Sequence, residues 1–456
     1  MKNMTLENIA KACGGQLFGK MEQMEIEHVV TDSRQAGKND LFVALKGEKT
    51  DGHRFIPQIL EKGAAALCEV APEGAEGPYI VVPDALKALR DIAEFYRSFL
   101  QIPIIGITGS VGKTSTKECI ASVLAQKYSV LKTEGNFNNE IGVPLTLLRI
   151  REEHQVAVVE MGINHFGEMH RLSSMVKPSL VVMTNIGQCH LEFLGDRDGV
   201  LKAKSEIFDF LQEDGTVIVN GDDDKLITLE KVNGKPVVTY GKGTGNSCYA
   251  EILENKGLFG TKMLIHTPKD TFEATIPLPG EHMIYNALAA TAVGITLGLT
   301  GEEIAAGIGA VQPSSGRCNI ISCKDRVLID DCYNANPVST CAAIDLLEKA
   351  DTRKVAVLGD MFELGDDEAK MHAQVGEHAV EKGIDLLICV GELSEHMAKA
   401  AESLAEKEGK AVKVVYYKEK DKMLSEIENL LEPEDTILIK ASHGMGFAEV
   451  VEKLNL

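Results

Sequence analysis

The segment Thr108-Gly109-Ser110-Val111-Gly112-Lys113-Thr114-Ser115 has the residue types and spacing of a phosphate-binding loop. Glycines let backbone N–H groups approach phosphate oxygens, and the N-terminus of a following helix adds partial positive charge. Lys113 can reach the β- and γ-phosphates of a nucleotide, and the Thr114 hydroxyl can bind Mg²⁺. Gly109 lies three residues before Gly112, whereas the common motif has five, so this is a shortened loop. We therefore expect the chain to bind ATP.

The flanking sequence supports this interpretation. The apolar run 102–107 predicts a strand before the loop, and the pattern to about residue 127 predicts a helix after it. The alternative is a tight strand-to-helix turn with an incidental lysine. Strand, glycine loop, Lys-Thr and helix in this order favour phosphate binding.

Polar residues follow two further predicted strands of the same segment. Ligands of parallel sheets bind at the carboxyl ends of the strands. Glu160 follows the strand 156–159 and offers a hard oxygen ligand for Mg²⁺, although a charged residue can also simply begin a loop. His190 follows the strand 180–183 and could position a phosphate, a metal or a carboxylate, although a lone histidine is usually structural.

Two lysines and two asparagine-rich loops are less specific. Lys202 and Lys204 are predicted to open a helix, where they oppose the helix dipole; a solvated face is the alternative. Asparagines gather in 135–142 and in 330–337, but asparagine is favoured in turns for its own backbone geometry.

Composition limits the classes of function. The 456 residues allow two to four domains, and 44% hydrophobic with 25% charged residues is ordinary for a globular protein. A net charge of −21 argues against a general nucleic-acid binder, which needs a basic face. It does not argue against a small anionic ligand, because local N–H groups and a few lysines can override the global field.

The cysteines and apolar runs point to the cytoplasm. Ten cysteines occur without a Cys-x-x-Cys pair, which fits reduced thiols better than disulfides or a zinc site. The N-terminus has no apolar signal region, and no apolar run approaches the roughly 20 residues that span a bilayer. We expect a cytoplasmic protein without membrane insertion.

The segments of the chain predict an α/β protein of three domains. These are a small N-terminal α/β domain (1–98), a central domain with a mostly parallel sheet (99–313) and a C-terminal doubly wound, Rossmann-like domain (314–456). A helix over 85–100 leads to the first boundary. Apolar runs predict strands over 26–30, 41–45, 79–82, 102–107, 156–159, 180–183, 217–219, 327–329, 354–358, 386–390, 412–416 and 436–439.

Taken together, these motifs resemble the Mur ligases. The phosphate loop, Asn138 to Thr146, Asn185-Ile186 with His190 to Glu192, and Ala203 to Phe208 carry the resemblance in the family's order. Within the family, 331–337 and 359–365 are most similar to members that join D-Ala-D-Ala to UDP-N-acetylmuramoyl-tripeptide. The N-terminal segments 31–34, 42–47 and 51–53 resemble the UDP-binding domain of those members.

The resemblance implies an enzyme of peptidoglycan synthesis that uses ATP to activate the tripeptide carboxylate as an acyl phosphate. The amino group of D-Ala-D-Ala then displaces phosphate. We expect this enzyme to be a monomer. The alternative is another amide ligase of the superfamily, either the one adding the third amino acid or a folylpolyglutamate ligase. The 333–337 segment and the UDP-binding N-terminus favour the first interpretation.

The resemblance also implies residue roles. Lys113, Glu160, His190 and Lys204 are the implied catalytic residues, and two Mg²⁺ ions are implied at Thr114, Glu160, His190 and Lys204, the last as a carbamate. The implied ATP-binding residues are Gly109, Ser110, Val111, Gly112, Lys113, Thr114, Ser115, Asn286, Arg317 and Asp331. The implied substrate-binding residues are Asp32, Ser33, Arg34, Lys46, Gly47, Asp51, His53, Asn138, Asn139, Tyr333, Asn334 and Asn336.

The chain departs from the family pattern at two positions. Met283 stands where the family usually has asparagine, and His443 stands where it commonly has arginine. Neither belongs to the phosphate or metal positions, so we expect altered affinity rather than lost chemistry.

Overall fold

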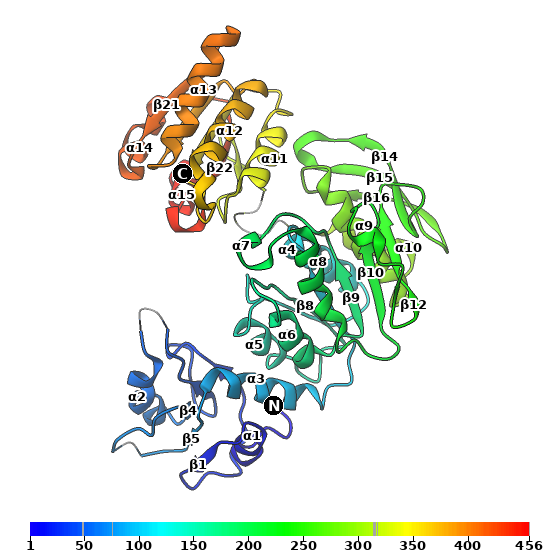
Figure 1. The fold of residues 1–456 in the computed structure, drawn as a ribbon, viewed down its shortest axis with the longest axis vertical. Coiled ribbons are helices and arrows are strands. Elements are labelled where there is room, and N and C mark those ends of the chain that lie inside the picture. The colour runs from blue at the N-terminus through cyan, green and yellow to red at the C-terminus, as the bar shows by residue number, and fades with distance from the viewer. Residues whose placement is uncertain (48–49, 75, 313–315, 317, 456) are drawn as a thin grey trace. The chain divides into compact units, whose positions relative to one another are not determined.

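The computed structural model describes residues 1–47, 50–74, 76–312, 316 and 318–455. Helices and strands alternate along much of the chain (Figure 1), and the chain forms two compact units. The first consists of Met1–Glu251, Ile265–Phe272 and Tyr285–Ile308, and the second of Ile252–Leu264, Glu273–Ile284 and Gly309–Leu456. Among the described residues, none of the helices has the length and apolar character needed to cross a bilayer.

The N-terminal sheet has five short strands in the order β1-β5-β4-β3-β2. All neighbours are parallel except the antiparallel pair β1 and β5. Because β2 and β3 are parallel neighbours, the loops that follow them leave the sheet at the same edge. The elements are α1 (Leu6–Ala12), β1 (Gln16–Phe18), β2 (Val29–Val30), β3 (Leu41–Val43), α2 (Ile56–Glu61), β4 (Ala65–Cys68) and β5 (Tyr79–Val81).

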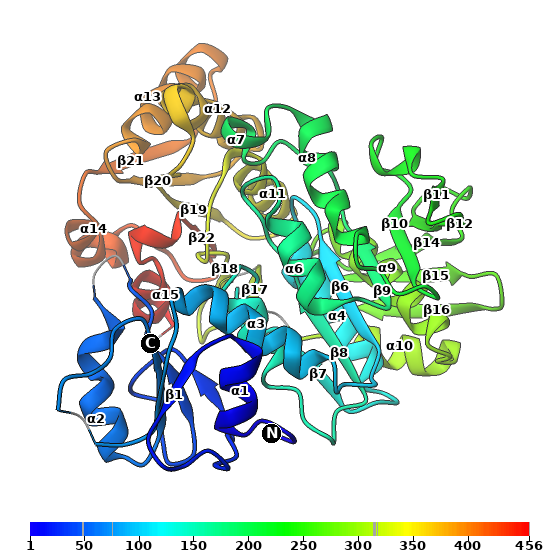
Figure 2. The same cartoon turned by 60° about the horizontal axis from the view of Figure 1, so that its bottom comes forward.

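The second sheet has the order β16-β15-β14-β13-β10-β9-β6-β8-β7. Strand β6 lies between β8 and β9 and is parallel to both (Figure 2). The strands are β6 (Ile104–Thr108), β7 (Val130–Lys132), β8 (Val156–Glu160), β9 (Leu180–Met183), β10 (Thr216–Asn220), β13 (Val238–Gly241), β14 (Cys248–Asn255), β15 (Thr261–His266) and β16 (Thr271–Ile276), with a separate ribbon of β11 (Lys231–Val232) and β12 (Lys235–Pro236). The helices are α4 (Lys113–Leu124), α5 (Gly142–Leu147), α6 (Glu168–Val176), α7 (Leu191–Leu194), α8 (Arg197–Ser205), α9 (His282–Thr296) and α10 (Gly301–Gly309).

The C-terminal sheet has the order β17-β18-β22-β19-β20-β21, in which all neighbours are parallel except β17 and β18. Alternate residues of β19 face opposite cores: Val355 and Val357 join one apolar cluster, and Ala356 and Leu358 join the other. Helices therefore cover both faces, which confirms the doubly wound arrangement. The elements are β17 (Asn319–Ser322), β18 (Val327–Asp330), α11 (Pro337–Leu347), β19 (Lys354–Gly359), α12 (Glu368–Glu381), β20 (Leu386–Val390), α13 (Ser394–Glu408), β21 (Lys413–Tyr417), α14 (Lys420–Glu426), β22 (Thr436–Lys440) and α15 (Ala448–Leu454).

The α/β prediction is confirmed, and every predicted strand overlaps an observed one. Helices separate β8, β9 and β10, but the stretch 238–276, which the structure describes completely, is built differently. Strands β13 to β16 follow one another there without an intervening α-helix. The composition of this stretch is mixed and polar, so its strands lack the continuous apolar runs that marked the buried ones.

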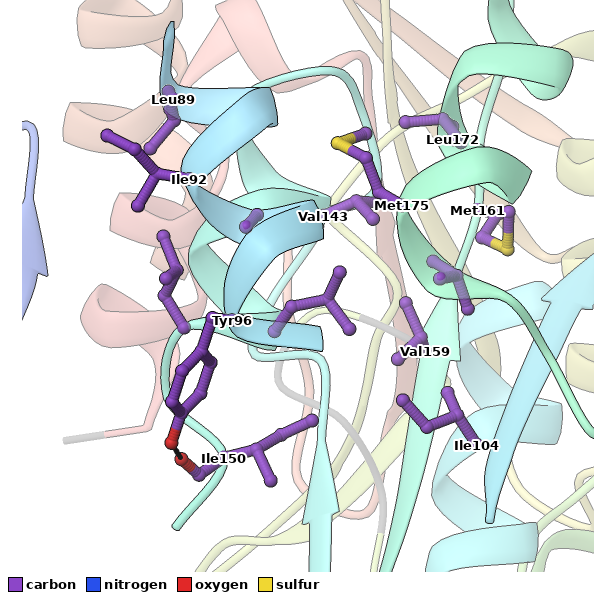
Figure 3. Close-up of a cluster of buried hydrophobic side chains, with 14 of the residues drawn as sticks. Leu89, Ile92, Tyr96, Ile104, Val143, Ile150, Val159, Met161, Leu172 and Met175 are labelled. Atoms are coloured by element: carbon purple, nitrogen blue, oxygen red, sulfur yellow. Dashed lines mark hydrogen bonds between the residues drawn. The ribbon is translucent and has the colours of Figure 1, made fainter. Parts of the chain in front are cut away.

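Helix α3 (Ala85–Arg97) joins the N-terminal sheet region to the core of the second sheet. Asp84 caps the helix by accepting a hydrogen bond from the Lys87 backbone N–H at 2.8 Å. Apolar residues at helical spacing, among them Leu89 and Ile92, place one face in the same buried cluster as α5, α6 and β8 (Figure 3). The Tyr96 hydroxyl donates to the Ile150 carbonyl oxygen at 2.5 Å and fixes the end of this contact.

This packing makes Ile92 a test of the first unit. Ile92 is fully buried, so Ile92→Ala should destabilise the unit by about 2–5 kcal/mol, because removing the side chain loses apolar burial and leaves a cavity. Urea unfolding, followed by far-ultraviolet circular dichroism, measures the change in the free energy of unfolding. The control Val70→Ala changes a side chain that is 65% exposed and should leave the midpoint nearly unchanged. Equal midpoints for both variants would contradict the packing of α3.

Candidate active site

The glycine loop lies between the end of β6 and the start of α4, as its flanking sequence predicted. Gly112 caps α4 with a left-handed φ of 82°, a conformation that favours glycine. Gly109 has a φ of 151°, and a Cβ atom there would lie 1.9 Å from the Thr184 Oγ1. The backbone conformation therefore requires glycine at both positions. At Gly109 the close approach of the loop after β9 also requires it.

Asn185 in the loop after β9 holds the glycine loop in place. Its carbonyl oxygen accepts a hydrogen bond from the Ser110 N–H at 3.0 Å. Its side chain accepts from the Val111 N–H and donates to the Val111 carbonyl oxygen, both at 2.9 Å. The Gly187 N–H donates to the Ser110 Oγ at 2.8 Å. Asn185 belongs to the family motif, but its contact with the glycine loop was not predicted, since its only local signal is an amide after a strand.

Lys113 and Thr114 begin α4 and face the loop and the neighbouring strand. The Lys113 Nζ donates to the Gly109 carbonyl oxygen at 2.8 Å. The Thr114 hydroxyl donates to the Glu160 Oε1 at 3.2 Å. The structure thus brings together a lysine, a hydroxyl and a carboxylate that sequence analysis predicted for the phosphate and metal site.

Glu160 is the last residue of β8 and is 1% exposed. Its Oε1 accepts hydrogen bonds from Thr114 and, at 2.8 Å, from the Asn138 side-chain amide. Its Oε2 is buried and has no hydrogen-bond donor among the described residues. A buried carboxylate oxygen without a donor, next to a hydroxyl, fits a hard divalent cation.

The ligand set around this carboxylate fits Mg²⁺. Across the described ranges there is no group of three or more histidine, cysteine, aspartate or glutamate side chains that could hold a metal. Mg²⁺ needs no such cage, because it usually takes one or two protein ligands and completes its shell with phosphate oxygens and water. Thr114 and Glu160 suit that role.

Lys204 lies at the end of α8, so the prediction that it opens a helix is wrong. Lys202 and Lys204 occupy the last turn, where positive charge is favourable to the helix dipole. Lys204 is 1% exposed. Burial, with a smaller contribution from the charge of Lys113, lowers the pKa of Lys204 to about 7. A neutral amine is therefore well populated at neutral pH.

Four further residues singled out from the sequence lie near the ends of helices α5, α7 and α9. His190 is the N-cap residue of α7 and has a left-handed φ of 51°. The Asn286 Oδ1 in α9 accepts a hydrogen bond from the Thr116 hydroxyl at 2.8 Å, which ties α9 to α4. Asn139 accepts from the backbone N–H groups of Ile141 and Gly142 and so shapes the start of α5. Met283 is buried in the first turn of α9.

Seven predicted substrate residues lie in the loops that follow β2 and β3. Asp32 forms an ion pair with Arg34 at 2.6 Å, and this contact lowers the pKa of Asp32 to about 2. The Asp51 Oδ1 lies 2.7 Å from the His53 Nδ1, and the backbones of Asp51 and Lys46 form an isolated antiparallel β-bridge. The full set is Asp32, Ser33, Arg34, Lys46, Gly47, Asp51 and His53. Because β2 and β3 are parallel neighbours, their loops meet at one sheet edge.

In the second unit, β18 and β22 are parallel neighbours whose ends bring Asp331 and Lys440 together. The Lys440 Nζ lies 2.5 Å from the Asp331 Oδ2 and donates to the Asn334 carbonyl oxygen at 3.0 Å. The Tyr333 ring lies 5.5 Å from the His443 ring, centroid to centroid. Lys440 was not among the predicted residues, because it ends an apolar strand as many surface lysines do.

Asn336 and Arg317 complete the predicted residues of this unit. The Asn336 side chain accepts a hydrogen bond from the Ser339 N–H and caps α11. Arg317, predicted to contact ATP, lies outside the described residues.

A glycine loop at the end of a central parallel strand, next to a buried carboxylate, defines an α/β protein that binds a nucleoside triphosphate. Family models for the Mur ligase family, catalytic domain (residues 25–97), the Mur ligase middle domain (107–294) and the Mur ligase, glutamate ligase domain (316–443) match this chain. The chain belongs to the Mur ligase family and has its three domains. It is therefore a ligase.

Relatives of known name cover the whole chain. The UDP-N-acetylmuramoyl-tripeptide–D-alanyl-D-alanine ligase of Bacillus subtilis (strain 168) is 39% identical over 100% of this chain and 99% of its own length. A crystal structure of MurF from Acinetobacter baumannii has a TM-score of 0.89 at 34% identity and covers 99% of this chain and 98% of that one. MurF ligase from Thermotoga maritima in complex with ADP has a TM-score of 0.79 at 27% identity, covering 94% and 97%.

The lowered pKa of Lys204 predicts a pH dependence of stability. Between about pH 7 and 10 the unfolded chain binds a proton at this lysine that the folded chain has released, so the free energy of unfolding rises with pH. Lys204→Met should remove this contribution, which has a slope of at most about 1.4 kcal/mol per pH unit. Urea unfolding in carbonate-free buffer at several pH values measures the difference.

Lys202→Met is the matched control, because it removes an exposed lysine from the same helical turn. Identical pH slopes for Lys204→Met and Lys202→Met would contradict a burial-lowered pKa at Lys204.

Proposed function

We propose that this ligase joins D-Ala-D-Ala to UDP-N-acetylmuramoyl-tripeptide, with ATP converted to ADP and phosphate. The observation that carries the proposal is the full-length similarity to ligases of that name, in a chain whose glycine loop and buried carboxylate are both intact. The alternative, another amide ligase of the superfamily, has no comparable support, because the relative at 39% identity carries the first name.

The glycine loop is the proposed ATP site. Gly109 to Ser115 would surround the phosphates, with Lys113 stabilising the charge on the transferred γ-phosphoryl group. Asn286 would lie near the adenine, and Asp331 and Arg317 would contribute from the C-terminal domain. The Lys113 ammonium donates a hydrogen bond to the Gly109 carbonyl oxygen, which keeps it beside the proposed phosphate site.

Thr114 and Glu160 are the proposed ligands of Mg²⁺, and His190 with Lys204 would serve a second ion. Mg²⁺ would offset the negative charge that builds up where phosphates and a carboxylate meet. The donor-free Oε2 of Glu160 supports this assignment.

The proposed reaction activates a poor electrophile. The carboxylate oxygen of the tripeptide attacks the γ-phosphorus, the bond to the ADP oxygen breaks, and an acyl phosphate forms. The free amine of D-Ala-D-Ala then attacks the acyl carbon, the nitrogen loses a proton to water, and the tetrahedral intermediate expels phosphate. Fixed cations of the chain, above all Lys113, stabilise the charge on the transferring group in the first step.

Lys204 is proposed to carry a carbamate. Carbamylation needs a neutral amine, because only the free base can attack CO₂ and release a proton. The buried lysine, whose pKa is lowered to about 7, supplies that base at neutral pH. The product is an anion, so a cation that would repel a metal becomes a group that can bind one.

The substrate residues follow the domain organisation. The loops with Asp32, Ser33, Arg34, Lys46, Gly47, Asp51 and His53 would bind the UDP part, and Asn138 and Asn139 would lie beside the substrate. Tyr333, Asn334 and Asn336 would border the entry of the dipeptide. We further propose the domain limits 1–98, 99–313 and 314–456, a monomeric state and a cytoplasmic location.

A ligation assay tests the function. Purified protein with Mg-ATP and the tripeptide, in lysine and diaminopimelate forms, should release ADP only when D-Ala-D-Ala is present, and the product mass should increase by one dipeptide unit. Lys113→Ala should lower turnover by at least about 100-fold, because it removes a cation from the transferred group. The control Lys87→Ala changes a surface lysine of α3. Dipeptide-independent ADP release as the sole activity would refute the proposed acceptor.

The carbamate has its own spectroscopic test. In buffer with ¹³C-labelled bicarbonate, the wild-type protein should show a carbamate carbonyl signal by ¹³C NMR that is absent from Lys204→Met and retained in Lys202→Met. Turnover of Lys204→Met should recover in part with added short-chain carboxylate. A spectrum that is the same for wild type and Lys204→Met would exclude the modification at this residue.

A further inference from the structure

A second buried lysine, Lys117, lies one turn beyond Thr114 in α4. Its side chain is fully buried, and it is one of the largest side chains in the chain to be so. Residues three apart on a helix share a face, so Thr114 and Lys117 both point toward β8. A buried ammonium is unfavourable unless it is paired, so its neighbours define its role.

Two carboxylates and one carbonyl oxygen surround the Lys117 ammonium. The Nζ lies 3.2 Å from the Glu118 Oε1 and 3.8 Å from the Glu160 Oε2, and it donates to the Gly135 carbonyl oxygen at 3.3 Å. Glu118 is paired a second time, with the half-exposed Lys132. Among the residues that the structure describes, Lys117 is therefore the cation in ion-pair range of the donor-free oxygen of Glu160, at a distance beyond a hydrogen bond.

We propose that Lys117 is a positioning residue that serves as the internal counter-ion of Glu160. In this role it prevents Mg²⁺ from binding the Glu160 carboxylate until the nucleotide is bound. The inference rests on the proposed function, in which Thr114 and Glu160 hold Mg²⁺. It adds an order of binding: the metal enters with the phosphates rather than ahead of them.

The charges explain this order. In the nucleotide-free protein, the ammonium compensates the buried carboxylate, so no second cation is needed there. A divalent ion on Glu160 would face the Lys117 charge in a region that water screens poorly, and like charges at that range repel strongly. A triphosphate brings several negative charges to the same place and outweighs the repulsion. Metal and nucleotide binding are thus coupled through one fixed charge.

Binding of Mn²⁺ alone to the nucleotide-free full-length protein, followed by electron paramagnetic resonance, tests the proposal. Lys117→Gln removes the charge but keeps an N–H donor for Gly135, and it should bind Mn²⁺ at least tenfold more tightly than wild type. Lys117→Arg keeps the charge and should bind as weakly as wild type. Lys132→Gln is the matched control, since it removes the other cation of Glu118 without approaching Glu160. It should also bind as wild type.

Equal Mn²⁺ affinity for Lys117→Gln and wild type would overturn the proposal. If Lys117→Gln is less stable than wild type, thermal unfolding can test the same point. Mn²⁺ should raise the Tm of Lys117→Gln more than it raises the Tm of wild type. An equal rise would overturn the counter-ion role.

Glu160→Gln separates this inference from the proposed function. If Mn²⁺ with ATP binds Glu160→Gln as well as wild type, the proposed metal role of Glu160 fails, and the counter-ion role fails with it. If Glu160 is needed for that complex but Lys117→Gln binds Mn²⁺ alone no more tightly than wild type does, only the role of Lys117 is overturned.

Discussion

The first unit depends on a single buried charge, the Glu160 carboxylate at the end of β8. An isolated carboxylate in a protein interior is strongly unfavourable, so its surroundings must supply donors and positive charge. A hydroxyl from α4, an amide from the loop before α5 and an ammonium one turn further along α4 do so. These groups lie on two segments, the helix α4 and the loop before α5, and the carboxylate lies on a third, the strand β8. Satisfying the one charge therefore fixes the strand, the helix and the loop relative to one another.

The parallel sheet explains why the reactive groups meet where they do. Strand β6 has β8 on one side and β9 on the other, so the glycine loop, Glu160 and the Asn185 loop all leave the same edge. The contact between Gly109 and Thr184 is so close that a methyl group would not fit between them. The shortened loop has little conformational freedom because it contains few residues. Its hydrogen bonds to Asn185 restrict the remaining backbone conformations.

Buried lysines are used in different ways in this protein. Lys204 has little compensating charge, and burial shifts it toward the neutral form. Lys117 has two carboxylates within ion-pair distance. Lys440 in the second unit is paired with Asp331 and a carbonyl oxygen. The chemistry available to each amine follows from its neighbours: the neutral one can act as a nucleophile, whereas the paired ones order the groups around them.

The sequence by itself determined the elements and the identity of most candidate residues. Apolar runs gave the buried strands, the spacing of Gly109, Gly112 and Lys113 predicted the phosphate loop, and strand ends predicted Glu160. These signals are local, because strand burial and glycine backbone geometry depend on nearby residues.

Only the tertiary structure decided the environment of each group. The position of Lys204 at the end of its helix could not be read from the sequence, because no glycine or proline marks that end and the chain continues as a 3-10 turn. Asn185 and Val111 are 74 residues apart, and Lys117 and Glu160 meet only through the packing of α4 on the sheet. Burial and charge pairing are properties of contacts between distant segments, and a single sequence does not record which segments those are.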